Sequence, residues 1–179
     1  MSEYQGVTPP NSVEAEQSVL GAMLQDGNAV LMAAESLLPE DFYQPQHKEI
    51  FDAMIALHRE QKPIDFITLD AELSRRGTLE GAGGSQYLLR LVQYVPTAAN
   101  VKAYISIVAE KSTLRKLIKA SQEIAQECYS QQNPLQETLG HAEKAIFDIV
   151  MNRASGEALK PIKDVLYNTY ANIEELSRL

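Results

Sequence analysis

Apolar residues recur at intervals of three and four along most of the chain, and this spacing predicts helices. In the first half, short periodic stretches are separated by turn-forming Gly, Pro, Asp and Asn residues. The helices expected there cover residues 13–24, 29–37, 46–60, 67–76 and 87–95. No stretch alternates apolar and polar residues convincingly, so we predict an all-α fold that begins with a small helical bundle.

Residues suited to helix ends stand at several of these boundaries. Asn11 followed by Ser12 offers an N-cap to the first helix, and Glu14 lies three residues after Asn11, as in a capping box. Asp65 is placed to cap the fourth helix, and Gly77 is placed to end it.

The second half predicts a long antiparallel helical hairpin. No Pro or Gly occurs between Ala98 and Cys128, which indicates one helix of about 30 residues, roughly 45 Å long. A polar turn over residues 131–134 precedes a second helix over 135–153, and a short turn between long helices favours a hairpin. We expect small residues to face each other in it: Ser121, Ala125, Ala142 and Ala145.

A separate amphipathic helix is predicted at the C-terminal end. Residues 154–160 read as a linker, and Pro161 is typical of a first helical position. An apolar stripe then continues to the last residue, which indicates an excised fragment. Because an isolated short helix is marginal in water, this helix needs a groove, either on its own hairpin or on a neighbouring subunit or domain. The predicted docking residues are Ile162, Val165, Leu166, Tyr170, Ile173 and Leu176.

Domain boundaries follow from this pattern. We predict an arm over residues 1–10, a globular helical bundle over 11–97, the hairpin over 98–153, a linker over 154–160 and a linker helix over 161–179. Composition agrees with packed helices: 45% of the residues are hydrophobic, but only 7% are aromatic and none is Trp. The apolar runs are too short to span a bilayer, and the single Cys128 fits a reducing cytoplasm.

Charge argues against general binding to nucleic acid. The formal net charge is −8, with 24 acidic and 16 basic residues. Affinity for nucleic acid arises largely from cations that displace counterions from phosphates, so proteins are the expected partners. One basic group is notable: Lys111, Arg115 and Lys119 share a face of the first long helix, with Lys116 beside them. This face is either merely solvated or a docking surface for an acidic partner.

The sequence predicts no catalytic, cofactor-binding or metal-binding residues in this chain. His47 and His58 lie eleven residues apart on one predicted helix, too far apart to share a metal, and we expect surface or half-buried histidines. Residues 81–85 are rich in Gly, but a Walker A loop also requires a Gly-Lys pair, which the chain lacks. A plain turn before a helix is the expected structure.

Ordered motifs in the first 150 residues resemble the N-terminal domain of the bacterial replicative DNA helicase, the DnaB family. They comprise Pro9 to Gly21 (PPNSVEAEQSVLG), Asp41-Phe42-Tyr43, His47 with Ile50-Phe51, Pro63-Ile64-Asp65 with Thr68-Leu69, Leu73, Arg76-Gly77, Gly83-Gly84 before Tyr87-Leu88, Val95 to Asn100 (VPTAAN), Tyr104, Ala142-Glu143 and Ile146-Phe147. The linker helix matches by position and pattern.

This resemblance implies a non-catalytic module of a larger machine. In the family, N-terminal domains pair into the collar of a homohexameric ring, and the collar binds the primase. The linker helix docks on the RecA-like motor domain of the adjacent subunit. The parent protein is an ATP- and magnesium-dependent 5′–3′ helicase that encircles single-stranded DNA at the bacterial replication fork, in the cytoplasm, and is placed there by a loader. The Walker A loop would lie beyond residue 179.

Two other classes of protein stay open on the sequence alone. A stand-alone helical adaptor or helicase regulator would share the helical front end without the motor. A small-molecule enzyme would require a ligand pocket in the core. The coding sequence after Leu179 distinguishes the helicase from the adaptor, because only the helicase continues into a strand and a Walker A loop.

Overall fold

The computed structural model describes residues 6–94 and 100–157, with side chains up to Asn152. These residues form seven α-helices and one 3-10 helix, and within them no strand occurs, so the predicted all-α fold is confirmed. The elements are α1 (Val13–Gln25), α2 (Gly27–Ser36), η1 (Pro39–Asp41), α3 (Pro45–Arg59), α4 (Phe66–Arg76), α5 (Gly84–Gln93), α6 (Val101–Ser130) and α7 (Leu135–Glu157).

The first helix, α1, is the centre of the bundle. It contacts α2, α3, α5 and the first turns of α6, so most of its circumference is buried. A helix surrounded in this way is apolar on more than one face, and Val19, Leu20 and Met23 are buried within it. Phe42 and Phe51 pack with their ring centroids 4.8 Å apart and complete the core beside it.

The two small helices at the far end of the bundle are shaped by capping residues. As predicted, the Asp65 side chain accepts from the Thr68 amide at the start of α4, and Gly77 ends α4 in the left-handed conformation, with φ 72°. Gly83 then precedes α5 with φ 100°, and a Cβ there would lie 2.8 Å from the Cβ of Tyr87. Only Gly fits this turn.

Three local predictions differ from the structure. Ser12, not Asn11, caps α1, because its side chain accepts from the Ala15 amide. The 3-10 turn η1 occupies a segment for which the sequence predicted no element. α7 continues to Glu157, four residues into the predicted linker, since a Ser-Gly pair costs a helix only about 1 kcal/mol.

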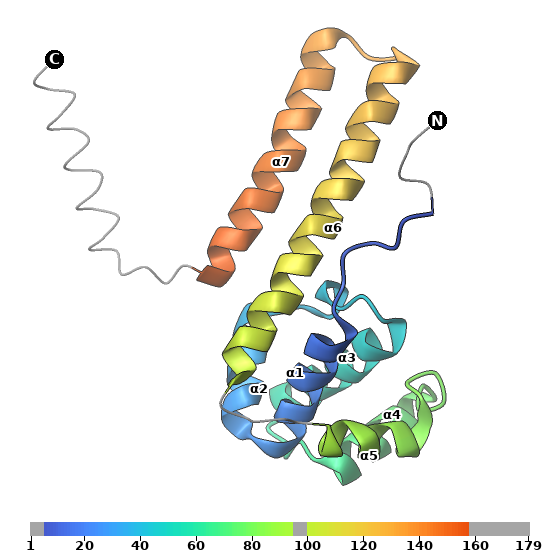
Figure 1. Ribbon diagram of the computed structural model, residues 1–179, viewed down its shortest axis with the longest axis vertical. Coiled ribbons are helices and arrows are strands. Elements are labelled where there is room, and N and C mark those ends of the chain that lie inside the picture. The colour runs from blue at the N-terminus through green and yellow to red at the C-terminus, as the bar shows by residue number, and fades with distance from the viewer. Residues whose placement is uncertain (1–5, 95–99, 158–179) are drawn as a thin grey trace, which may run out of the picture.

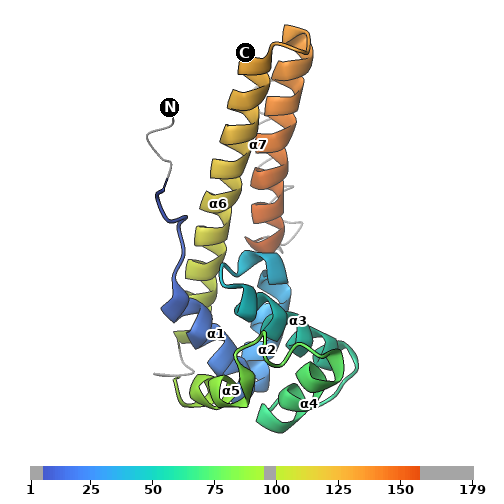
Figure 2. The same ribbon diagram turned by 90° about the vertical axis from the view of Figure 1, so that its right-hand side faces the viewer.

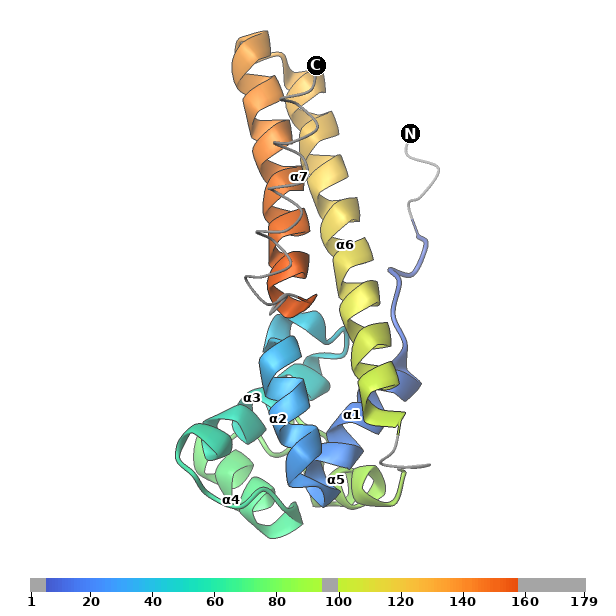
Figure 3. The same ribbon diagram turned by 90° about the vertical axis from the view of Figure 1, so that its left-hand side faces the viewer.

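The long hairpin rises from one side of the bundle (Figure 1). The beginning of α6 packs on α1 and α2, and its remainder continues beyond the bundle beside α7 (Figure 2). Gln131 ends α6 with φ 51°, and the chain turns through residues 131–134 as predicted. The end of α7 returns to contact α2, as Figure 3 shows from the opposite side.

Candidate interaction surface on the helical hairpin

The projecting part of the hairpin has little buried surface of its own. On α6 the apolar residues Val101, Ile105 and Val108 belong to the bundle core, and the last buried residue is Ala120. Ten residues of α6 follow Ala120, a length of about 15 Å. No side chain described on this projecting part of the hairpin is fully buried.

The seam between α6 and α7 is built from half-buried residues. Ile124 of α6 and Ala142, Ala145 and Ile149 of α7 are partly covered, as the seam of a two-helix hairpin requires. The expectation that Ser121 and Ala125 would face α7 is wrong, because both are exposed. The seam instead runs through Ala120 and Ile124, one residue earlier on the helix. Small residues favour close approach, but the packing of α6 on the bundle fixes its rotation about its axis.

Large apolar side chains remain exposed on both helices of the hairpin. On α6, Ile107, Leu114 and Ile118 lie at i, i+7 and i+11 and therefore share one face. On α7, Phe147 is 61% exposed, and other apolar side chains are exposed around it: Leu135, Leu139, Ile146, Val150 and Met151. Exposed apolar residues on both helices make the hairpin a candidate interaction surface. We call these nine residues, taken over the two helices together, the apolar hairpin surface.

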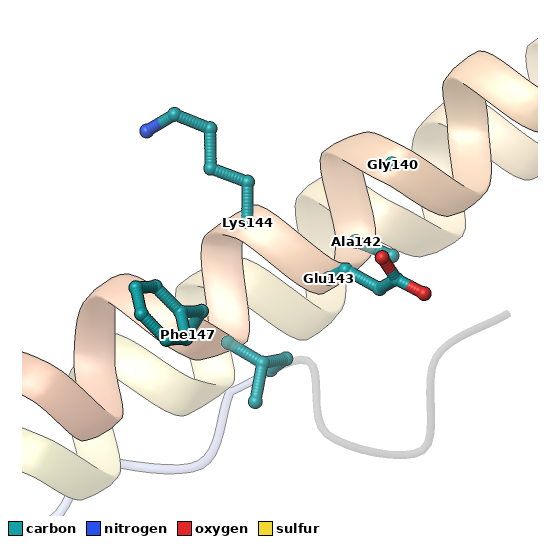
Figure 4. A pocket seen from close by; sticks show the side chains of 6 residues that line it. Gly140, Ala142, Glu143, Lys144 and Phe147 are labelled. Carbon is teal, nitrogen blue, oxygen red and sulfur yellow. The ribbon is translucent and has the colours of Figure 1, made fainter.

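An open pocket lies on α7 beside Ile146 and Phe147 of this surface. It is lined by Gly140, Ala142, Glu143, Lys144, Ile146 and Phe147. Figure 4 shows the Phe147 ring and the Lys144 side chain projecting away from the helix axis. Gly140 carries no side chain, and nothing lies within 4 Å of where its Cβ would be. Gly140 therefore leaves this end of the pocket open.

The four cations predicted as a docking face divide into two pairs. Arg115 is half-buried: one guanidinium nitrogen donates to the carbonyl of Pro10 at 2.7 Å and the other to the carbonyl of Asp41 at 2.7 Å. Burial lowers the pKa of the Arg115 guanidinium, against the opposing effects of Glu16, Asp41 and Tyr43. Lys116 forms an ion pair with Asp41.

The other two cations, Lys111 and Lys119, differ in exposure. The Lys119 side chain is 79% exposed, and its ammonium lies 4.0 Å from the Glu123 carboxylate. Lys111 is half-buried. An exposed pair at 4.0 Å contributes little to stability, so Lys119 stays available to a partner. A docking role for these cations stays a prediction.

The tip of the hairpin is held by one carboxylate. Glu127 accepts from Asn133 Nδ2 at 2.8 Å, from His141 Nδ1 at 2.8 Å and from Thr138 Oγ1 at 3.2 Å. These hydrogen bonds, with Asn133 and then His141 contributing most, lower the pKa of Glu127. The turn is therefore tied across both helices, and the hairpin projects as one ordered unit.

A buried polar network inside the bundle is a feature that the sequence did not indicate. His47 is completely buried, which corrects the expectation of a surface or half-buried histidine. Its Nδ1 lies 2.9 Å from Glu16 Oε1 and its Nε2 lies 2.6 Å from the Tyr87 hydroxyl. Gln17 Nε2 donates to the same hydroxyl at 3.3 Å. The network joins residues 31 to 70 positions apart, so no local pattern could reveal it.

Glu16 is the acceptor at the end of this network. Its two carboxylate oxygens also accept the backbone amides of Tyr43 and Gln44, at 3.1 and 3.3 Å. A neutral imidazole has one donor and one acceptor nitrogen, so in the tautomer with the proton on Nδ1 His47 donates to Glu16 and accepts from the Tyr87 hydroxyl. The network joins α1, α3 and α5, and among the described residues no buried side-chain nitrogen or oxygen lacks a hydrogen-bond partner, which suits a structural role for the network.

The predicted linker helix lies outside the described residues, so its docking stripe has no structural counterpart here.

Among residues 6–94 and 100–157, no group of three or more His, Cys, Asp and Glu side chains is placed to hold a metal ion. None of the described helices combines the length and the apolar character needed to cross a membrane.

Comparison with protein families gives the assignment. Residues 8–110, more than half of the chain, match the family model described as the DnaB-like helicase N-terminal domain. The chain belongs to this family. The match covers the bundle and the first turns of α6, which are the parts that carry the Glu16 network and most of the core.

Several bacterial replicative helicases are similar in sequence. The chain is 43% identical to the replicative DNA helicase DnaC of Bacillus subtilis (strain 168) over 168 residues, which are 94% of this chain and 37% of the relative. It is 46% identical to DnaB of Geobacillus stearothermophilus, with the same coverage. DnaB of Mycobacterium leprae (strain TN) is 39% identical over 178 residues, covering 98% of this chain and 29% of the relative. The chain thus spans about a third of the length of these relatives.

Two solved structures share the fold. The crystal structure of the N-terminal domain of DnaB helicase from Mycobacterium tuberculosis has a TM-score of 0.74 and 43% identity, covering 79% of this chain and 99% of that one. A structure of a DnaB-like replicative helicase, described with its interactions with primase, has a TM-score of 0.64 and 26% identity. It covers 91% of this chain and 35% of that one.

Proposed function

We propose that this chain is the oligomerisation and primase-docking region of a bacterial replicative DNA helicase. The relatives of similar sequence are replicative helicases about three times as long as the chain. The parent protein would be an ATP- and magnesium-dependent 5′–3′ helicase that unwinds duplex DNA at the replication fork, in the bacterial cytoplasm. Its motor would lie outside these residues, and the chain by itself would hydrolyse no ATP.

The observation that carries the oligomerisation role is the apolar hairpin surface. Exposed apolar residues lie along the two helices of the hairpin, and the described part of the chain leaves them accessible. When a second copy of the chain packs on these residues, apolar area is removed from water, which is the main driving force of association. Pairs formed in this way would build the collar of a hexameric ring.

Partner recognition is proposed for the same part of the molecule. A solved helicase with this fold is described with its interactions with primase. Exposed Lys119, with Lys111, offers positive charge beside the apolar hairpin surface and suits an acidic protein partner. A net charge of −8 makes strong binding of single-stranded DNA by this region unfavourable, so DNA would be held by the parent ring. A helicase loader is the other expected protein partner.

The linker helix completes the proposal. Its apolar stripe, which includes Ile162, Leu166, Tyr170 and Ile173, would dock on the motor domain of the adjacent subunit. An amphipathic helix that docks in this way would connect neighbouring subunits around the ring. Crosslinking within the full-length helicase, between cysteines introduced on the stripe and on the motor domain, would show whether the contact joins two subunits.

Self-association is tested by sedimentation equilibrium of the chain and of Phe147→Asp. Burial of a Phe side chain contributes about 1.5–3 kcal/mol, so loss of this anchor weakens a dimer by about tenfold or more. Gln136→Asp is the matched control, because it adds the same charge to an exposed position of α7. A chain that stays monomeric at high concentration, or a Phe147→Asp variant that associates unchanged, contradicts the proposal.

Primase docking is tested separately, by calorimetric titration of the chain with the C-terminal domain of a primase from the same organism. Binding should weaken on Lys119→Glu. The coding sequence after Leu179 decides between the helicase and a stand-alone adaptor. A strand followed by Gly-x-x-x-x-Gly-Lys-Ser/Thr supports the helicase, and a stop codon supports the adaptor.

A further inference from the structure

The junction between bundle and hairpin contains a polar cluster that the oligomerisation role does not explain. Beyond its apolar contacts with the core, α6 places Ser112 in a buried position with 2% exposure. The Ser112 hydroxyl donates to Asp41 Oδ1 at 2.6 Å. Asp41 ends η1, and its other oxygen, Oδ2, accepts the Leu38 amide at 2.7 Å. One buried carboxylate therefore fixes the η1 turn and binds α6 to it.

Two further side chains of α6 converge on the same turn. Lys116 Nζ lies 3.1 Å from Asp41 Oδ1, one helical turn after Ser112. Arg115 donates to the carbonyls of Asp41 and Pro10, and its guanidinium lies 5.5 Å from the centroid of the Tyr43 ring. A planar guanidinium that bridges two carbonyls and lies over an aromatic ring has little freedom to rotate. The cluster thus joins α6, η1 and the arm before α1.

The polar contacts of the cluster add directional restraint to the apolar packing beside them. Packing of Val101, Ile105 and Val108 holds only the first turns of α6 on the bundle and favours one crossing angle there. A charge-assisted hydrogen bond weakens steeply with misalignment. The cluster lies further along α6 than the apolar contacts, where it opposes tilting more effectively.

The geometry of α6 amplifies any tilt. From Ser112 to Ser130 the helix extends 18 residues, or about 27 Å. A rotation of about 10° at the junction would therefore move the hairpin tip by about 5 Å. The apolar hairpin surface would move with it, and a displacement of that size at the tip is comparable with the spacing of about 5–6 Å between neighbouring side chains on a helix face.

We propose that Asp41 and Arg115 are positioning residues that hold the hairpin at one tilt relative to the bundle, and thereby preset the face that the hairpin offers to a second copy of the chain. The second part, the choice of the face offered to a second copy, rests on the proposed oligomerisation. The first part, the tilt of the hairpin, concerns the single chain. Arg115 is thus assigned to the architecture of the junction rather than to a partner.

Distances between two spin labels test the tilt. Cys128 near the tip is exposed and provides the first label, and Ser74→Cys, exposed on α4, provides the second. Doubly labelled chain is diluted into unlabelled Cys128→Ser chain so that only distances within one molecule are measured. Asp41→Asn and Arg115→Gln should broaden the distance distribution and shift it by several ångströms. Lys119→Gln, which removes an exposed cation from the same helix, should leave it unchanged.

A milder variant keeps the test decisive if a substitution at Asp41 prevents folding. Ser112→Ala removes one hydrogen bond and leaves Lys116 paired with Asp41, so it should broaden the distribution less than Arg115→Gln. Far-ultraviolet circular dichroism of each variant shows that its helices are intact. Distributions that stay as narrow as in the parent chain, in folded Arg115→Gln and Ser112→Ala, overturn the proposal.

Sedimentation equilibrium on the same variants separates the two parts of the proposal. If the tilt sets the interface, Arg115→Gln should weaken self-association at least tenfold, although Arg115 lies at the junction and is half-buried. Altered tilt with unchanged affinity overturns the second part alone. A parent chain that is monomeric throughout refutes the proposed oligomerisation, and the distance distributions still decide the first part.

Discussion

Loss of one hydroxyl, in Tyr87→Phe, should measurably destabilise the bundle. The Tyr87 hydroxyl is hydrogen-bonded to His47 Nε2 at 2.6 Å and accepts from Gln17 Nε2 at 3.3 Å. His47 is completely buried, so water does not reach most of its ring. The substitution keeps the aromatic ring and removes only the polar atom that satisfies the imidazole.

The magnitude follows from what is left unpaired. His47 Nδ1 keeps its partner Glu16, but Nε2 loses its hydrogen bond and stays in the core. A buried polar atom without a partner costs about 1–3 kcal/mol, more than the net gain of about 1 kcal/mol from an ordinary hydrogen bond. We therefore expect the free energy of unfolding to fall by about 1–3 kcal/mol. For a chain of this size, Tm falls by about 2–4 °C for each kcal/mol.

Urea denaturation followed by circular dichroism measures this change. Because self-association stabilises the folded state, the parent and the variant are compared at two protein concentrations. Tyr129→Phe is the matched control: Tyr129 is 88% exposed, so its loss should change stability by less than about 0.5 kcal/mol. A Tyr87→Phe variant as stable as the parent would refute the assignment of the network as a structural element of the bundle.

Two other predictions concern acid stability and helix propensity. Hydrogen bonds from Arg75 and Arg76 lower the pKa of Glu72 from 4.5 to about 2, so its stabilising contribution is complete above pH 4.5 and is lost as the pH falls toward 2. On unfolding in this pH range, the parent chain takes up about one proton at Glu72, and Glu72→Gln should remove this uptake. Denaturant titrations between pH 2 and 5 measure it as the slope of the free energy of unfolding against pH. A slope that is the same in the parent and the variant would contradict the assignment. Gly140→Ala should stabilise the chain by about 0.5–1 kcal/mol, because Gly140 lies inside α7 with open space at its Cβ position. Gly77→Ala should instead destabilise it, because φ is 72° there, and equal effects of the two substitutions in thermal unfolding would refute this reasoning.

Local chemistry decided most of the helix boundaries. The Asp65 cap and the Gly77 terminator lie where the sequence placed them, because a cap needs only residues within one turn of the helix. Local sequence did not decide whether Asn11 or Ser12 caps α1. Both residue types can cap a helix, and which of them faces the free amides of α1 depends on how the arm enters the bundle.

The candidate surface was predicted in part. Helical spacing identified the hairpin and the shared face of its cations, since both follow from the helical repeat. It could not show that Arg115 and Lys116 bind η1, because η1 lies more than 70 residues earlier in the chain. The same limit hid the burial of His47, whose partners come from two other helices.

The sequence by itself determined that this protein is helical and that its second half contains a long helical hairpin. It also determined that the chain carries the ordered motifs of the DnaB-like helicase N-terminal domain. These properties depend on residues near one another along the chain, whose periodicity and caps act over one or two turns. Only the tertiary structure decided which cations stay exposed, which histidine is buried and which apolar residues the bundle leaves uncovered. Those outcomes depend on the position of α6 against η1 and α1, which is set by packing and hydrogen bonds between segments far apart in the sequence.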